Sequence, residues 1–308
     1  MVEVPTRQVN IIHPGREIFK HNPQPKKGTR EHCSLLPSQE QKAEKMNKKS
    51  VLHLLTMLFM GLLLFSACTF TTVRGSGNVV EETREVSGIT GVNLGTLGDL
   101  TITLGDTESL IIEAEENLLQ YFQTEVRNGM LHINTSSDVQ IQTTRPVRYF
   151  LTVTNLDTIE ISSSGNITAP DLNADRFAIE ISSSGELEMG DLNAGRAEVS
   201  ISSSGDVNMG LMNAETLTVE ISSSGNLDIA GGEVDSQNID ISSSGNYTAP
   251  DLASNEADVR ITSSGNATIW VQDRLRADLS SSGNVNYRGN PTVDATTSSS
   301  GQVMQISE

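Results

Sequence analysis

The chain has few histidines and cysteines, which are residues that many enzyme active sites use. Its 308 residues include only five histidines and two cysteines. Four of the histidines and Cys33 precede Cys68, so His132 is the only histidine after that point. A metal set of His and Cys is therefore excluded there, and a Ser-His-Asp triad would have to use His132. Neither a Gly-x-Ser-x-Gly elbow nor a phosphate-binding glycine loop occurs.

Positive charge is also scarce after Cys68. Residues 68–308 contain 11 Arg, no Lys and 34 Asp plus Glu, a formal net charge of −23 against −18 for the whole chain. Such a surface disfavours nucleic acid and anionic lipid and helps to keep a repetitive β protein soluble. Carboxylate-rich columns could hold Ca²⁺, but we favour plain solvation. No cofactor is indicated.

Helical spacing of apolar residues is absent, and a short phrase recurs in its place. Residues 161–166 read Ile-Ser-Ser-Ser-Gly-Asn, and the intervals between copies are 20 residues five times and then 18 twice. The later copies start at Ile181, Ile201, Ile221, Ile241, Ile261, Leu279 and Thr297. A fixed period predicts a stack of similar coils in which each coil contacts only its neighbours.

Within each repeat, polar and apolar residues alternate on both sides of the phrase. Ile167 and Ala169 follow one copy, Phe177 and Ile179 precede the next, and a turn at Pro170-Asp171 separates them. This alternation predicts half-buried strands. We expect Asn and Ser columns to form hydrogen-bonded ladders, and the phrase Gly to adopt a backbone conformation closed to other residues. The alternatives are a flexible Gly/Ser linker, which would not keep aliphatic residues at fixed offsets, and a metal-binding nonapeptide roll, whose glycine-aspartate phrase is missing.

These patterns predict an all-β fold, a single-stranded parallel β-helix with coils of about 20 residues. The regular repeats occupy residues 151–308, and residues 74–150 form a less regular β-rich part. Within 74–150 we expect strands over 98–104 and 109–114, a helical turn or corner over 115–122, and a hairpin turn at Asn128-Gly129. Gly75-Ser-Gly-Asn78 reads as a first, degenerate copy of the phrase.

The front of the chain has the features of an export signal. Residues 46–67 combine a basic start, an apolar run from Val51 to Phe65 and small residues before Cys68. The segment resembles a bacterial lipoprotein signal, with Phe65 where Leu is usual, and the resemblance implies that Cys68 is lipid-modified and becomes the first mature residue. A transmembrane anchor is the alternative, although the run is short and includes His53. Residues 1–45 are interpreted as a spurious or disordered extension before a true start at Met46, and residues 68–73 as an anchor linker.

Residues 74–305 resemble the bacterial GIN-domain family, whose members are described as autotransporter-adhesin heads. The matching features are Gly75-Ser-Gly-Asn78, the run 84–92, Gly98-Asp99, the run 113–117, Asn128-Gly-Met-Leu131 and the Ser-Ser-Gly-Asn coils. The resemblance implies a secreted β-helix, often lipoprotein-anchored, with no established enzymatic activity.

For function, we expect an extracytoplasmic β-helix, anchored to the cell envelope by lipid on Cys68 and exposed on the outer face of the plasma or outer membrane. It would serve as a non-catalytic surface binding or adhesion module or an envelope scaffold, with a glycan or cell-surface partner. The alternative is a carbohydrate-active β-helix enzyme of the lyase or hydrolase kind.

Trp270 is the one candidate ligand contact, in a turn column with Pro170 and Pro250, although covering the end of the core is the interpretation we favour. Self-association through the open edge of the last coil is a further expectation.

Overall fold

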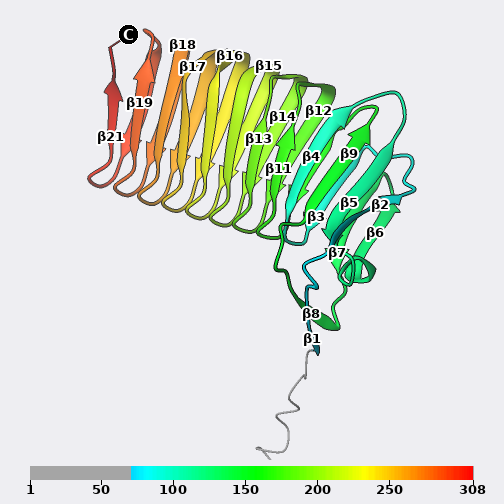
Figure 1. The fold of residues 1–308 in the computed structure, drawn as a ribbon. Coiled ribbons are helices and arrows are strands. Elements are labelled where there is room, and N and C mark those ends of the chain that lie inside the picture. The colour runs from blue at the N-terminus through cyan, green and yellow to red at the C-terminus, as the bar shows by residue number, and fades with distance from the viewer. Residues whose placement is uncertain (1–70, 308) are drawn as a thin grey trace, which may run out of the picture. The chain divides into compact units, whose positions relative to one another are not determined.

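The computed structural model describes residues 71–307, all within one compact unit, Cys68–Glu308 (Figure 1). The extension 1–45, the signal segment 46–67 and the lipid-attachment residue Cys68 lie outside the described residues. None of the helical structure in residues 71–307 has the length and apolar character needed to cross a membrane. The unit has two regions, a regular stack of coils and a less regular region that precedes it.

The repeated phrase builds a β-solenoid of about seven turns over residues 158–305. Its strands are β10 (Thr158–Ile161), β11 (Asn166–Ala169), β12 (Leu172–Ile181), β13 (Glu186–Met189), β14 (Leu192–Ile201), β15 (Asp206–Ile221), β16 (Asn226–Ile241), β17 (Asn246–Ile261), β18 (Asn266–Leu279), β19 (Asn284–Arg288), β20 (Thr292–Thr297) and β21 (Gln302–Gln305). Each strand pairs in parallel with its equivalent in the next coil, so the predicted fold class is confirmed (Figure 1).

The pairing places like residues above one another. Ile159 pairs with Ile179, and Ile201 with Ile221, at the 20-residue offset of the repeat. These inward columns are almost completely buried, and they form one continuous apolar core with the preceding region. Because a coil buries its apolar face only against its neighbours, the stack rather than the single coil is the stable unit.

The phrase glycines are required by space and not by backbone conformation. None of them has a positive φ, so the expectation of a special conformation is wrong. A Cβ on Gly225 would overlap the carbonyl oxygen of Gly205 and the Cγ2 of Ile201, and the same collision recurs along the column. The strand ends at Ile161 and its equivalents, and backbone bonds such as Gly265 N–H to Ser243 C=O (2.9 Å) join the corners. Only glycine lets successive corners approach this closely.

The second corner changes along the stack. Pro170-Asp171 separates β11 from β12, as predicted, and Gly190-Asp191 separates β13 from β14. From Asp206 onward the strand continues through this corner, so β15, β16 and β17 are each 16 residues long. In the later coils the chain therefore stays in one strand through the corner, although the in-register pairing skips the corner residues, as between Asp228–Thr248 and Gly232–Leu252.

The preceding region combines parallel and antiparallel pairs. Its elements are β1 (Thr71–Arg74), β2 (Val79–Arg84), β3 (Gly91–Gly95), β4 (Asp99–Leu104), β5 (Ser109–Glu115), the 3₁₀ helix η1 (Leu119–Tyr121), β6 (Phe122–Arg127), β7 (Met130–Thr135), β8 (Val139–Gln142) and β9 (Arg148–Val153). β3 and β4 pair in parallel with β10 and β11 on one side and with β7 and β9 on the other. β5 and β6 add antiparallel pairs, so this region covers the first coil (Figure 1).

The degenerate copy of the phrase is not where the sequence suggested. Ile161 pairs with Leu94 and Ile167 with Leu100, so residues 94–99 occupy the position of a preceding corner. Asn166 N–H donates to the carbonyl of Gly98 (3.1 Å), as later coils do at this place. The assignment of Gly75-Ser-Gly-Asn78 to this role is therefore wrong.

Local signals in this region are confirmed. Asn128 and Gly129 both have positive φ, 51° and 84°, and join β6 to β7 as an antiparallel hairpin. The expected helical turn over 115–122 is η1. Both features depend on neighbours in sequence, which is why they were predictable.

Candidate functional site

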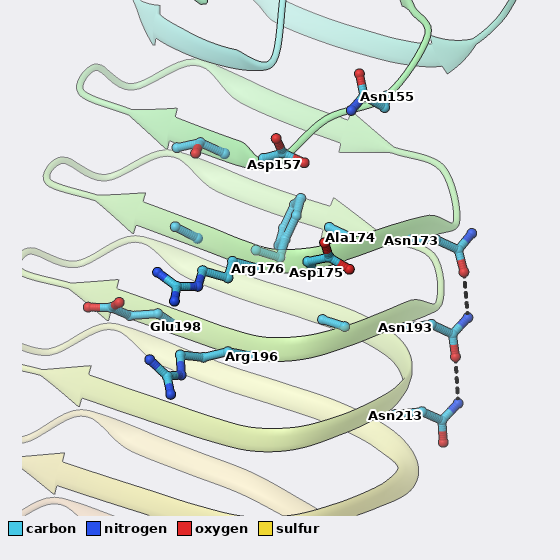
Figure 2. Close-up of a pocket in the computed structure, with 14 residues that line it drawn as sticks. Asn155, Asp157, Asn173, Ala174, Asp175, Arg176, Asn193, Arg196, Glu198 and Asn213 are labelled. Atoms are coloured by element: carbon cyan, nitrogen blue, oxygen red, sulfur yellow. Dashed lines mark hydrogen bonds between the residues drawn. The ribbon is translucent and has the colours of Figure 1, made fainter.

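A shallow groove lies on the outer surface of the first regular coils. It encloses about 1110 Å³ and is lined by the segment before β10 and by the middle of β12 and β14 (Figure 2). Its lining residues are Asn155, Asp157, Thr158, Asn173, Ala174, Asp175, Arg176, Phe177, Ala178, Asn193, Ala194, Arg196, Glu198 and Asn213. Most are polar and Phe177 is buried, so the groove offers hydrogen-bonding groups alongside apolar atoms.

An amide ladder, defined as Asn173, Asn193 and Asn213, borders one edge of the groove. Asn193 Nδ2 donates to Asn173 Oδ1 (3.1 Å), and Asn213 Nδ2 donates to Asn193 Oδ1 (3.0 Å) (Figure 2). The three side chains are exposed and come from equivalent positions of β12, β14 and β15. This column is not the one that the sequence predicted, which follows the phrase glycines.

A guanidinium pair, defined as Arg176 and Arg196, projects from the opposite part of the groove. The two residues are in-register partners on β12 and β14, and both side chains are exposed. Figure 2 shows them extending in the same direction, with Glu198 beside them and Asp175 nearer the amide ladder. Among residues 71–307, neither guanidinium lies within salt-bridge distance of a carboxylate.

A second, smaller hollow of about 430 Å³ lies over β16, β17 and β18. Its arginines are paired: Arg274 contacts Glu256 at 2.6 Å, and Arg276 lies 3.9 Å from Asp258. In each case the carboxylate occupies the equivalent position one coil earlier. The two hollows therefore have similar composition but different charge pairing.

A second Asn ladder follows the phrase glycines. Asn226 Nδ2 donates to Asp206 Oδ1 (2.7 Å), Asn246 to Asn226 (2.8 Å), Asn266 to Asn246 (3.0 Å) and Asn284 to Asn266 (3.0 Å). These side chains are half-buried against the corner. This column stabilises the stack, and its members do not line the groove.

Trp270 lies in β18 and is half-buried, away from both hollows. Its partners are Ala253 in one neighbouring coil and Arg288 in the other, so its assignment to the column of Pro250 is wrong. The register shifts between Ala249 and Ala253, where the first 18-residue coil is shortened. Its role as a ligand contact stays a prediction.

His132 lies on β7, and its in-register neighbours are Asn93 and Glu125. In residues 71–307, no group of three or more His, Cys, Asp or Glu side chains is arranged to hold a metal ion. Tyr247 is buried, and its hydroxyl donates to Gln237 Oε1 (2.7 Å). Burial raises the pKa of Tyr247 well above its usual range.

Glu115 is a buried carboxylate that sequence reasoning did not identify. Its oxygens accept hydrogen bonds from Gly77 N–H (2.6 Å), Thr144 N–H (2.8 Å) and the Thr144 hydroxyl (2.6 Å). Burial acts to raise the pKa of Glu115, but the hydrogen bonds from Thr144 and Gly77 outweigh it and lower the pKa below its usual value. The Gly75-Ser-Gly-Asn78 segment therefore packs against the Glu115 carboxylate, and this contact attaches the start of the described chain to the end of β5.

The groove residues were also missed, although the repeat contains their signal. Alignment at 20 residues places Arg176 over Arg196 and the three ladder asparagines in one column. The sequence does not show which of these columns face the same hollow, so the groove could not be identified from it.

The fold and groove define the class: a parallel β-solenoid with a polar outer groove and an irregular β-rich start. A family model described as "Putative auto-transporter adhesin, head GIN domain" matches residues 89–207 and again 189–291, more than half of the chain. The chain therefore belongs to the GIN-domain family. The two matches overlap at 189–207, as expected when equivalent coils can align in shifted register.

Solved structures share this fold. A protein from Parabacteroides distasonis described as a putative adhesin aligns with a TM-score of 0.71 and 20% identity, covering 76% of this chain and 100% of its own. A putative adhesin from Parabacteroides merdae gives 0.70 and 20%, covering 77% and 100%. A second Parabacteroides distasonis protein, described as a putative lipid binding protein, gives 0.65 and 22%, again covering 77% and 100%. At these identities the likeness establishes the fold. No curated protein matches the chain.

Proposed function

We propose that the protein is a non-catalytic binding or adhesion module of the bacterial cell envelope, or a scaffold there, and that its groove binds a glycan. The observation that supports this most directly is the polar groove on an in-register stack. Strands paired on both sides hold their side chains about 4.8 Å apart. Side chains fixed in this way lose little freedom when a ligand binds, which favours affinity.

The chemistry of the groove suits a hydroxyl-rich ligand. Amide, carboxylate and guanidinium groups supply both donors and acceptors to sugar hydroxyls. The exposed amide ladder alone presents equivalent groups on three successive coils. A polymer lying across the coils would meet the same group at regular spacing.

The test uses the protein from Thr69 onward, which contains every described residue of the compact unit and its continuous core. It is incubated with a polysaccharide panel, and depletion of polymer is scored separately from product formation. We expect retention without new reducing ends or unsaturated products, and loss of retention in Asn173→Ala/Asn193→Ala. The matched control is Asn226→Ala, which interrupts the other ladder outside the groove.

The same assay decides on the enzyme alternative. The observation in its favour is that Asp157, Asp175 and Glu198 line the groove, and paired carboxylates are the groups that glycosidases use. Product formation that disappears in Asp175→Asn would replace the proposal by a carbohydrate-active enzyme.

The lipid anchor on Cys68 is a separate part of the proposal, supported by the signal-like segment before it. Cells fed a labelled fatty acid should label the wild-type protein but not Cys68→Ser. Thr69→Ser, which changes the neighbouring residue and keeps Cys68, is the matched control and should label normally. Labelled Cys68→Ser, or membrane retention through an uncleaved segment, would contradict this part.

Self-association through the last coil also remains a proposal. In the described residues, β20 pairs only with β18 and β21 only with β19, and Val293 (38%) and Met304 (42%) are exposed beside them. An unpaired edge with apolar side chains favours pairing with a second molecule. Sedimentation should show concentration-dependent dimers that Val293→Lys abolishes, and a monomer at high concentration would exclude them.

A further inference from the structure

The guanidinium pair has an unusual arrangement for so acidic a protein. Arg176 and Arg196 are in-register neighbours on adjacent strands, which lie about 4.8 Å apart in a parallel sheet. Like charges directly opposite one another on neighbouring strands are unfavourable. The next residue in this column is Thr216, so the fold does not require Arg at the position.

Other arginines on the same outer surface are arranged differently. Further along the same column, Arg274 follows Glu256 and forms an ion pair at 2.6 Å. In the column two residues along, Arg276 follows Asp258 at 3.9 Å. Arg274 and Arg276 each contact a carboxylate from the preceding coil. Arg176 and Arg196 stack on each other, and no carboxylate of residues 71–307 lies within salt-bridge distance of either.

We propose that the guanidinium pair is an anion-binding subsite that selects polysaccharides carrying anionic groups on their sugars. The inference rests on the proposed glycan-binding function and names its ligand class. Two guanidinium groups present parallel N–H donors that match the two oxygens of a carboxylate or the oxygens of a sulfate. The anion would relieve the repulsion between the two arginines, and the amide ladder across the groove would bind neutral hydroxyls of the same chain.

The surroundings limit how densely charged that polymer can be. Asp157, Asp175 and Glu198 share the groove with the pair, and the part of the chain after Cys68 carries a net charge of −23. A dense polyanion would be repelled by these carboxylates within the Debye length of about 8 Å at physiological salt. The fit is therefore to a polymer with isolated anionic sugars among neutral ones. An anionic lipid surface is disfavoured for the same reason.

The test measures the binding of four probes, and of a fifth that changes the anion, to the protein from Thr69 onward. They are pectin with most carboxyl groups methyl-esterified, fully de-esterified polygalacturonate, neutral dextran, and vesicles rich in phosphatidylglycerol. A dextran lightly substituted with sulfate groups replaces the carboxylate source by a sulfate source. We expect the sparsely charged pectin to bind at least about tenfold more tightly than dextran, equivalent to about one hydrogen bond to a charged group.

The variants assign the effect to the pair. Arg176→Gln/Arg196→Gln should lose about tenfold in pectin affinity, and Arg274→Gln/Arg276→Gln should stay within about twofold. Polygalacturonate should bind more weakly than pectin at low salt, with the difference narrowing as salt screens the carboxylates. Circular dichroism and Trp270 fluorescence confirm that both variants are folded.

Each other result has a defined meaning. Equal binding of pectin by wild type and Arg176→Gln/Arg196→Gln, or equal binding of dextran and pectin, would overturn the anion subsite while leaving the glycan-binding module in place. Retention of vesicles instead of polysaccharide would overturn the ligand class. If wild type retains no polysaccharide, the proposed function fails as well.

Discussion

The two regions of this molecule are both β-rich, yet they are held in shape by different means. In residues 71–153, positive-φ residues, a hairpin and a buried carboxylate fix individual segments. In residues 158–305, the same contacts recur coil after coil, and close approach rather than positive φ requires the phrase glycines. The difference is between contacts made once and contacts made in columns. A repeated contact can be read from the period of the sequence, whereas a single contact between segments far apart in the chain cannot.

The largest expected loss of stability comes from replacing glycines. A phrase glycine is required by close approach of neighbouring atoms, and a glycine of the preceding region by its positive φ. Gly225→Ala forces a Cβ into the Gly205 carbonyl and Ile201, and overpacking of this sort costs about 3 kcal/mol. Gly77→Ala has open space around the new Cβ but a φ of +81°, which costs about 1–2 kcal/mol. Denaturant unfolding followed by circular dichroism measures both.

Asn separates the two causes, because it tolerates positive φ better than Ala. Gly77→Asn should recover part of the loss, and Gly225→Asn should be no better than Gly225→Ala. Recovery at position 225 would show that conformation, not space, governs the corner.

The next largest loss of stability is expected at Glu115, the one carboxylate that is buried among residues 71–307. Glu115→Gln replaces an acceptor of three short hydrogen bonds by an amide, and hydrogen bonds to charged groups contribute about 1.5–3 kcal/mol. Hydrogen exchange at Gly77 and Thr144 should accelerate. Fluorescence of Trp270, the only Trp, reports the distant coils and should change little if the contact is local.

The same residue predicts a pH dependence. The pKa of Glu115 is lower in the folded protein than in the unfolded chain, so its contribution is complete above the unfolded value of about 4.5. It is lost as pH falls through the lower, folded pKa. The stability difference between wild type and Glu115→Gln should therefore shrink on acidification below about pH 4.5. A difference that stays constant down to pH 2 would contradict this assignment.

A smaller effect compares the two Asn ladders. Asn246→Ala removes two hydrogen bonds in a half-buried column, at a cost of about 1–2 kcal/mol. Asn193→Ala removes two bonds in the exposed amide ladder, where water replaces them, and should cost less. Thermal unfolding of both variants measures the comparison, and equal losses would mean that burial does not distinguish the ladders.

The smallest effect concerns the guanidinium pair. Arg196→Thr places in the second coil the residue that the third coil already has, and it removes a like-charge contact. Stability should rise, by less than about 0.5 kcal/mol, with the gain disappearing at high salt. Arg274→Thr is the matched control and should lower stability slightly, because it breaks an ion pair with Glu256.

Features that repeat, or that depend on near neighbours in the chain, were predictable from the amino-acid sequence. The 20-residue interval predicted the coil, its inward Ile column and the Asn ladder, because in-register stacking converts a period into contacts. Asn128-Gly129 predicted the hairpin, because its φ values are a local property.

Features that depend on contacts between residues far apart in the chain were visible only in the folded structure. In the structure, the degenerate corner lies at residues 94–99, and Gly77 of the Gly75-Ser-Gly-Asn78 segment donates a hydrogen bond to Glu115. Trp270 pairs with Ala253 instead of lying in the column of Pro250. It also showed that Arg176 and Arg196 face one groove without carboxylate partners in the described chain. Such relations arise from packing between segments separated by tens of residues, and no local pattern encodes which of several similar segments will meet.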